Sequence, residues 1–144
     1  MRHTASLDTP ADLGSAWDAL IDVTSWPQWT ASMTAVERLD DGPLRIGSRA
    51  RIKQPGFPWL VWEVSDIQDG VEFTWFTTAA GTRTTGRHVL DRNPDGTTRI
   101  TLILDQTGPL GVVFGALTAA KTRRFLALEV AGLKAASEAA SAAR

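Results

Sequence analysis

The sequence predicts an α+β fold in which a curved antiparallel sheet of six to seven strands wraps around a long C-terminal helix, with two short helices near the N-terminus. Three observations favour this fold. Strand-like segments separated by Gly, Pro, Asn and Asp turns fill the middle of the chain. One long helical segment follows them. Charged residues keep to one face of the strands. With 144 residues, the chain is expected to form a single domain over 1–144.

The N-terminal part predicts a strand followed by two short helices. Residues 2–8 alternate weakly, as an opening strand would. A helix start is then expected, with Thr9 as the cap, Pro10 at the first helical position and Asp12 as the acid of a capping box. This helix places four apolar residues at core-facing spacing, namely Leu13, Ala16, Trp17 and Leu20. A second short helix starts near Asp22 and is interrupted by Pro27.

Turn signals then divide the chain into consecutive antiparallel strands. The signals are Pro55-Gly56, Asp69-Gly70, Ala80-Gly81 and Asn93-Pro94-Asp95-Gly96. The strands they separate are expected near residues 34–40, 47–54, 59–67, 71–79, 82–92 and 97–106. After Gly108-Pro109 the long helix begins and runs to about Ala140.

Hairpin geometry predicts which side chains share a face of the sheet. If Asp69-Gly70 and Ala80-Gly81 are two-residue turns, Trp75 pairs with Val64 on one side and Gly86 on the other, and Phe73 pairs with His88. A glycine across from a tryptophan leaves room for the ring. Other side chains expected on this inward face are Ala50, Ile52, Gln54, Trp62 and Asp66. If the last hairpin has a loop of odd length, the face also includes Leu90, Ile100, Leu102 and Leu104. Asp66 is a candidate to orient His88.

The two faces of this sheet predict a cavity. The opposite face carries charged residues that belong in water: Arg49, Arg51, Lys53, Glu63, Glu72, Arg83 and Arg87. The other face must be covered by little more than one helix, so a sheet wider than that helix has to curl around it. The space left between them is lined by inward aromatic rings. Six tryptophans in so short a chain fit such a wall.

The C-terminal helix carries two apolar stripes. The first contains Leu110, Val113, Phe114, Leu117 and Leu128, and the second contains Ala116, Ala119, Leu126, Val130 and Leu133. A helix that is apolar on two sides is wedged between layers or lies in an interface. A homodimer is therefore a possible assembly.

These features resemble the START-like superfamily, also called SRPBCC, and its polyketide cyclase/dehydrase family. The matching residues are Asp22 with Trp26-Pro27-Gln28-Trp29, Gly47, Trp62, His88, Gly108-Pro109-Leu110-Gly111, and Glu129 with Gly132-Leu133-Lys134. The resemblance covers essentially the whole chain. It implies the helix-grip fold of the birch pollen allergen and an internal cavity for lipids, hormones, polyketides or quinones. It also implies that only some members are enzymes.

We therefore expect the chain to bind a small hydrophobic or aromatic molecule, lipid- or polyketide-like, in this cavity. The candidate ligand-binding residues are Trp26, Trp29, Ile52, Trp62, Phe73, Trp75, His88, Leu102, Phe114, Leu117 and Lys121. One alternative is a cyclase or dehydratase in which His88 shuttles a proton. Another is a protein-interaction or chaperone-type module.

Several side chains are left open by the sequence. Trp26 and Trp29 either close the bottom of the core or flank the mouth of the pocket. The facing of four residues is also undetermined: Trp59, Glu37, Lys121 and Arg124. The ligand itself is not identified by any of these patterns.

Composition argues against several other classes of function. A net charge of −1 gives no basic field for nucleic acid. With no cysteine and two histidines, no metal site is expected, and without phosphate-binding or dinucleotide glycine patterns no cofactor is expected. The nearly apolar stretch from Leu110 to Ala120 is too short to insert across a membrane. A cytoplasmic location is the expectation.

Overall fold

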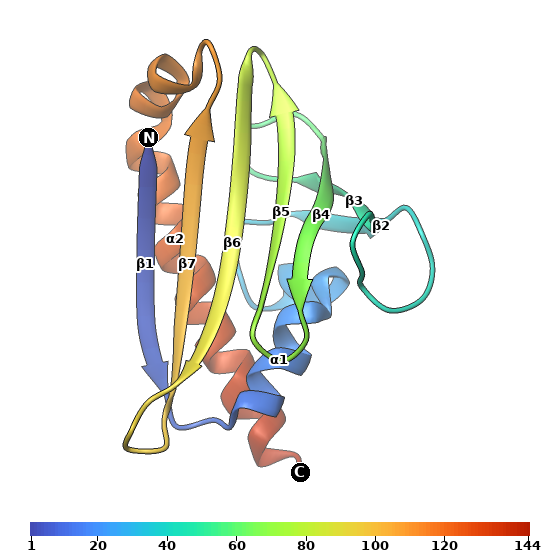
Figure 1. Ribbon diagram of the computed structural model, residues 1–144, viewed down its shortest axis with the longest axis vertical. Helices are drawn as coiled ribbons and strands as arrows, with labels where there is room; N and C mark the ends of the chain where they lie inside the picture. The colour runs from blue at the N-terminus through green and yellow to red at the C-terminus, as the bar shows by residue number, and fades with distance from the viewer.

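The computed structural model describes residues 1–144 and consists of one seven-stranded sheet, two α-helices and a short 3-10 helix, η1 (Figure 1). The elements in chain order are β1 (Arg2–Thr9), α1 (Leu13–Ile21), η1 (Val23–Gln28), β2 (Ala35–Arg38), β3 (Arg49–Lys53), β4 (Leu60–Gln68), β5 (Glu72–Ala79), β6 (Thr82–Arg92), β7 (Thr98–Thr107) and α2 (Gly111–Ala142). This is the fold predicted from the sequence.

The sheet is antiparallel throughout, in the order β1-β7-β6-β5-β4-β3-β2. Figure 1 shows α2 lying along one face of the sheet, with α1 at one end and β2 and β3 turned away behind the central strands. The main contacts of α2 with the sheet are with β1, β7 and β6, and it also packs on α1. Because α2 rests on one half of a curved sheet, the strands of the other half stand away from it.

The predicted register of the central hairpins is confirmed, although one turn differs from the prediction. Trp75 pairs with both Val64 and Gly86, and the β5–β6 connection is the predicted two-residue turn. The β4–β5 turn contains three residues instead of two, because Gln68 pairs with Glu72. A β-bulge between Val64 and Asp66 offsets the extra residue and restores the predicted pairing.

The bulge overturns the prediction for Asp66. Inserting one residue into a strand reverses the face of every side chain beyond it. Asp66 is therefore exposed on the outer face, paired with Thr74, while Ile67 turns toward the core. Asp66 does not orient His88.

The start of the first helix also differs from the prediction. Thr9 is the last residue of β1, paired with Thr98, so it remains extended and cannot cap the helix. Asp12 is the N-cap instead: its side chain accepts a hydrogen bond from the backbone N–H of Ser15 at 3.1 Å. The strand pairing thus moves the helix start to Leu13, beyond the bend at Pro10.

The long helix α2 turns one of its two predicted stripes toward the core. Leu126, Val130 and Leu133 are buried. The other stripe reaches the cavity only through Phe114, and its first turns are exposed, with Leu117 retaining 81% of its accessible surface. Neither α2 nor any shorter helix combines the length and hydrophobicity of a membrane-crossing segment.

Candidate functional site: a cavity between the sheet and the C-terminal helix

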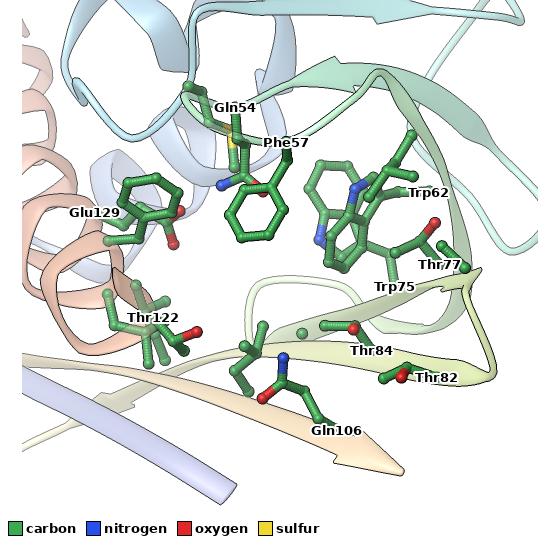
Figure 2. A pocket seen from close by; sticks show the side chains of 18 of the residues that line it. Gln54, Phe57, Trp62, Trp75, Thr77, Thr82, Thr84, Gln106, Thr122 and Glu129 are labelled. Carbon is green, nitrogen blue, oxygen red and sulfur yellow. The ribbon is translucent and has the colours of Figure 1, made fainter. Parts of the chain in front are cut away.

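A cavity of about 210 Å³ lies between α2 and the inner face of the sheet, where its lining comes from β4, β5, β6 and β7. Figure 2 shows its walls, with Glu129 and Thr122 on α2 facing Trp62 and Trp75 across the space. A cavity of roughly 150 Å³ holds a benzene molecule, and drug-sized ligands occupy about 300–1,000 Å³. The cavity in this structure therefore has the size for a molecule of one or two rings.

The floor of the cavity is an aromatic cluster centred on Trp26. Its ring centroid lies 5.2 Å from that of Trp75, 5.3 Å from that of His88 and 6.2 Å from that of Phe73. The indole N–H of Trp26 donates a hydrogen bond to the carbonyl of Leu20 at 2.9 Å. Because Trp26 is only 1% exposed and both its ring and its N–H are held, it forms a fixed wall and not a mobile rim.

The sheet side of the cavity owes its depth to Gly86. Gly86 on β6 lies between Trp75 on β5 and Leu104 on β7, and it has no side chain to fill the space between these two neighbours. A Cβ atom placed on Gly86 would already lie 3.4 Å from the ring of Trp75. Trp62 extends the same wall, with its centroid 5.8 Å from that of Trp75.

The remaining side is closed by aromatic contacts between α2 and the β3–β4 connection. The ring centroid of Phe57 lies 6.4 Å from that of Phe114 and 6.2 Å from that of Phe125. Lys53 holds this connection in place by donating hydrogen bonds to the carbonyls of Gln54 and Phe57. Three lining residues beside it are exposed, which marks where the cavity approaches the surface: Pro58, Ala79 and Ala80.

His88 lines the cavity as a neutral side chain. Its Nδ1 lies 3.1 Å from the carbonyl oxygen of Phe73, so Nδ1 carries the proton and Nε2 is left as a hydrogen-bond acceptor. The ring also stacks on Phe73 with centroids 4.3 Å apart. Burial lowers the pKa of His88 to about 4, while the hydrogen bond to Phe73 acts in the opposite direction.

Glu129 is the second titratable group in the wall. It projects from α2 into the cavity, and its Oε1 accepts a hydrogen bond from the hydroxyl of Ser32 at 2.9 Å. Ser32 in turn lies 2.8 Å from the hydroxyl of Thr30. Burial raises the pKa of Glu129 to about 7, and the hydrogen bond from Ser32 acts in the opposite direction. The carboxyl group is therefore partly protonated near neutral pH.

The raised pKa of Glu129 predicts how stability changes with pH. Between the ordinary value of 4.5 and about 7, the folded chain holds a proton on Glu129 that the unfolded chain releases. The contribution of Glu129 to stability is thus present below about pH 4.5 and is lost as the pH rises through 7. Glu129→Gln keeps an oxygen that accepts the hydrogen bond from Ser32, and it removes this pH-dependent loss of stability. We expect the unfolding free energy of the variant to rise relative to wild type by about 3 kcal/mol between pH 4.5 and 7.

Denaturant unfolding of both proteins at several pH values measures this difference. The pKa of His88 affects both proteins alike, so its contribution cancels. Glu138→Gln is the matched control, because Glu138 lies on the same helix in an i,i+4 pair with Lys134. A difference between Glu129→Gln and wild type that does not change with pH would contradict a buried, proton-holding Glu129.

Most of the candidate ligand-binding residues lie around the cavity, while a few do not. The cavity is lined by Trp26, Trp62, Trp75, His88, Leu102 and Phe114. Ile52 and Phe73 are buried behind this lining, and Trp29 borders a smaller void beside it. Whether these side chains contact a ligand stays a prediction.

Two candidate ligand-binding residues, and the residues whose facing the sequence left undetermined, lie outside the cavity lining. Leu117 points into solvent, so the prediction that it lines the cavity is wrong. Lys121 is exposed at the rim, with its Nζ 5.1 Å from the ring centroid of Phe57. Trp59, Glu37 and Arg124 are exposed, and the guanidinium of Arg51 lies 4.4 Å from the ring centroid of Trp59.

The residues that the sequence analysis missed are mainly polar or come from the β3–β4 connection. They are Phe57, Thr77, Thr82, Thr84, Gln106, Thr122, Phe125 and Glu129. The threonines on β5 and β6 share strand parity with Trp75 and His88, and Gln106 shares parity with Leu102, so alternation alone would have placed them inward. Glu129 lies one turn after Leu126 on the buried stripe.

No group of three or more His, Asp or Glu side chains lies together in a way that could hold a metal ion. The site is thus a largely apolar space with aromatic walls that also holds His88, Glu129 and several hydroxyl groups. A curved antiparallel sheet gripping a long C-terminal helix around such a space defines the helix-grip class of proteins.

Comparison with known proteins places the chain within this class. The model of the family described as polyketide cyclase/dehydrase and lipid transport matches residues 2–138, and the chain belongs to this family. No curated protein gives a significant sequence match.

Solved structures show the same fold at low sequence identity. TTHA0849 from Thermus thermophilus is 18% identical with a TM-score of 0.78, covering 98% of this chain and 99% of its own. The ZhuI aromatase/cyclase from a Streptomyces species is 13% identical with a TM-score of 0.77, covering 96% and 93%. The Bet v 1-like allergen Ara h 8.0201 is 10% identical with a TM-score of 0.60, covering 100% and 99%.

Proposed function

We propose that this protein binds an apolar or aromatic small molecule, lipid- or polyketide-like, in the cavity between the sheet and α2. The observation that carries the proposal is the space of about 210 Å³, whose wall holds Trp26, Trp62 and Trp75. Apolar cavities of this kind bind small apolar molecules because the walls are preformed and poorly hydrated. Membership of a family that includes lipid transport supports the same function.

Calorimetric titration with aromatic hydrocarbons of increasing size tests this proposal. We expect saturable one-to-one binding of toluene and 2-methylnaphthalene, and weaker binding of the four-ring compound pyrene, because the cavity holds one or two rings. Native mass spectrometry of the purified protein then searches for a bound molecule of similar size. Absence of saturable binding for toluene and 2-methylnaphthalene, or equal binding of all three compounds, would contradict binding inside the cavity.

The second candidate is a cyclase- or dehydratase-like enzyme, and the two titratable groups in the wall favour it. His88 was the predicted proton shuttle, but a pKa of about 4 makes it a weak base near neutral pH. Glu129, with a pKa of about 7, is better matched to proton transfer at that pH. In such an enzyme we infer that Glu129 moves the proton and that Nε2 of His88 accepts a hydrogen bond from the substrate.

A turnover assay with a polyketide-like carbonyl compound separates these roles. Glu129→Gln is expected to abolish turnover while leaving binding measurable, and His88→Ala is expected to weaken both. Full turnover in Glu129→Gln would remove this mechanism.

A homodimer and a cytoplasmic location stay predictions. Sedimentation of the purified protein tests the homodimer.

A further inference from the structure

One end of the cavity is lined mainly by polar side chains, whereas the remainder is mostly apolar apart from Gln54, His88 and Glu129. Thr77 on β5, Thr84 on β6 and Gln106 on β7 are paired across the sheet and form one inward row. Thr82 lies beyond this row on β6, and Thr122 faces it from α2. Figure 2 shows Thr82, Thr84 and Gln106 together on the side of the cavity opposite Gln54, with Thr77 beside Trp75 and Thr122 across the space on α2. Thr77, Thr82, Thr84, Gln106 and Thr122 are together called the polar end.

The hydroxyls of the polar end have no hydrogen-bond partner within the protein. The oxygen of Thr82 is completely buried and unpaired, and Thr77, Thr84 and Thr122 form no side-chain hydrogen bond either. The other buried hydroxyls of this protein are all hydrogen-bonded: Thr9, Ser15, Thr30, Ser32, Ser48, Thr98 and Ser137. Two other buried polar atoms without a partner, Nε2 of His3 and Nε of Arg38, lie away from the cavity. Among the buried hydroxyls, however, those without a partner occur only at the cavity wall, and such hydroxyls are available to a ligand.

Gln106 contributes an amide that is also largely unused. Its Nε2 lies 3.4 Å from the hydroxyl of Thr118, which itself donates to the carbonyl of Phe114 at 2.9 Å. Because that hydroxyl proton is already engaged, Thr118 can only accept from Gln106, and this fixes the direction of the amide. One N–H and the carbonyl oxygen of Gln106 therefore remain without a partner, although the residue is only 3% exposed.

The polar end carries no charge. Among all residues lining the cavity, only Arg87 and Glu129 are formally charged types. The guanidinium of Arg87 is paired with Glu72, 2.5 Å away, and both residues belong to the outer face of the sheet. Hydroxyl and amide groups both donate and accept, so together they complement a group that does the same. A carboxylate or phosphate would find no cation at the polar end.

We propose that Thr77, Thr82, Thr84, Gln106 and Thr122 form a recognition subsite that selects an uncharged aromatic ligand bearing a hydroxyl group. The aromatic body lies over Gly86, between Trp75 and Leu104, and its hydroxyl reaches the row formed by Thr84 and Gln106. This inference rests on the proposed binding function and gives it a ligand class.

Three naphthalene compounds that differ in one substituent test the subsite: 2-naphthol, 2-methylnaphthalene and 2-naphthoate. Dissociation constants are measured by calorimetry for wild type, Gln106→Met and Thr84→Val. The preference for 2-naphthol is the dissociation constant of 2-methylnaphthalene divided by that of 2-naphthol. The two compounds are hydrated differently, but this difference is the same for every protein and cancels when the preferences of two proteins are compared. We expect each subsite variant to reduce the preference by about fivefold, the usual effect of one hydrogen bond.

Matched controls carry the same changes on the outer face. The controls are Thr85→Val and Gln68→Met. Thr85 lies beside Thr84 and points away from the cavity, and Gln68 is exposed on β4. Both are expected to keep the wild-type preference. Thr84→Val should also melt no lower than wild type without ligand, because it removes a hydroxyl that has no partner, whereas Gln106→Met also removes the hydrogen bond to Thr118. If Gln106→Met fails to fold, Thr84→Val alone decides the comparison.

The possible outcomes of this experiment separate the subsite from the binding function. A preference that falls in both subsite variants and in neither control supports the subsite. An unchanged preference, with 2-methylnaphthalene still bound, overturns the subsite and leaves the proposed binding function standing. Tighter binding of 2-naphthoate than of 2-naphthol overturns the selection of an uncharged ligand. If neither 2-naphthol nor 2-methylnaphthalene binds wild type, the binding function fails and the subsite with it.

Discussion

Replacing Gly86 with leucine is expected to abolish binding of 2-methylnaphthalene while leaving the protein folded. Gly86 provides the gap in the sheet wall between Trp75 and Leu104. The Cβ of a substituted residue would lie 3.4 Å from the ring of Trp75, an acceptable contact, and the rest of the leucine side chain would extend into the cavity. Filling a cavity with apolar atoms commonly stabilises a protein by about 0.5–2 kcal/mol. Loss of binding with an equal or higher melting temperature is therefore the predicted result.

Two further substitutions separate occlusion of the cavity from general damage. Gly86→Ala adds only the Cβ atom that the site accommodates, so it should weaken binding much less than leucine does. Thr85→Leu adds a similar side chain on the outer face of the same strand and should leave binding unchanged. Wild-type affinity in a folded Gly86→Leu protein would show that the ligand binds elsewhere.

Gly132→Ala is expected to cause the largest loss of stability among small substitutions. Gly132 is buried in α2 where the helix crosses the segment that follows η1. A Cβ atom there would overlap the carbonyl oxygen of Trp29 and lie 2.7 Å from Cε3 of the same residue. Backbone atoms cannot rotate away as a flexible side chain can. We expect a loss of about 3 kcal/mol in unfolding free energy, despite the gain of about 1 kcal/mol that alanine brings to a helix.

Ala131→Gly is the matched control, one residue earlier on the exposed side of α2. It should lower stability by about 1 kcal/mol through helix propensity alone. Thermal unfolding compares the two variants, and Gly132→Ala should melt about 10 °C below wild type. A Gly132→Ala protein as stable as wild type would show that α2 and Trp29 are not packed as described.

The antiparallel fold was largely predictable because its register depends on local turn chemistry. The turn at Ala80-Gly81 places Gly86 opposite Trp75 and His88 opposite Phe73, as expected from the sequence. The bulge near Ser65 was not predictable, because no Gly or Pro marks it. It compensates for a turn that is one residue longer than expected, so the predicted pairing holds at Val64 and fails only between the bulge and the turn, from Asp66 to Gln68.

The site was predicted less completely than the fold. Helix periodicity identified two apolar stripes on α2 but could not decide how the helix is rotated against the sheet. Leu117 was therefore placed in the cavity although it is exposed. The polar end was overlooked for a different reason. Strand parity would have placed Thr84 and Gln106 inward, but an inward polar group in a strand is normally hydrogen-bonded. Only the structure shows that the hydroxyl of Thr84 and the carbonyl oxygen of Gln106 have no partner.

The measurement that tests binding in the cavity most directly is the NMR spectrum of the six tryptophan indole N–H groups during titration with 2-methylnaphthalene. Single Trp→Phe variants assign the signals. Trp62 and Trp75 line the cavity, whereas Trp17 packs in α1 and Trp59 lies on the outer surface. We predict that the signals of Trp62 and Trp75 shift in proportion to occupancy while those of Trp17 and Trp59 stay unchanged. A shift confined to Trp59, or saturable binding that moves none of the indole signals, would contradict a ligand in this cavity.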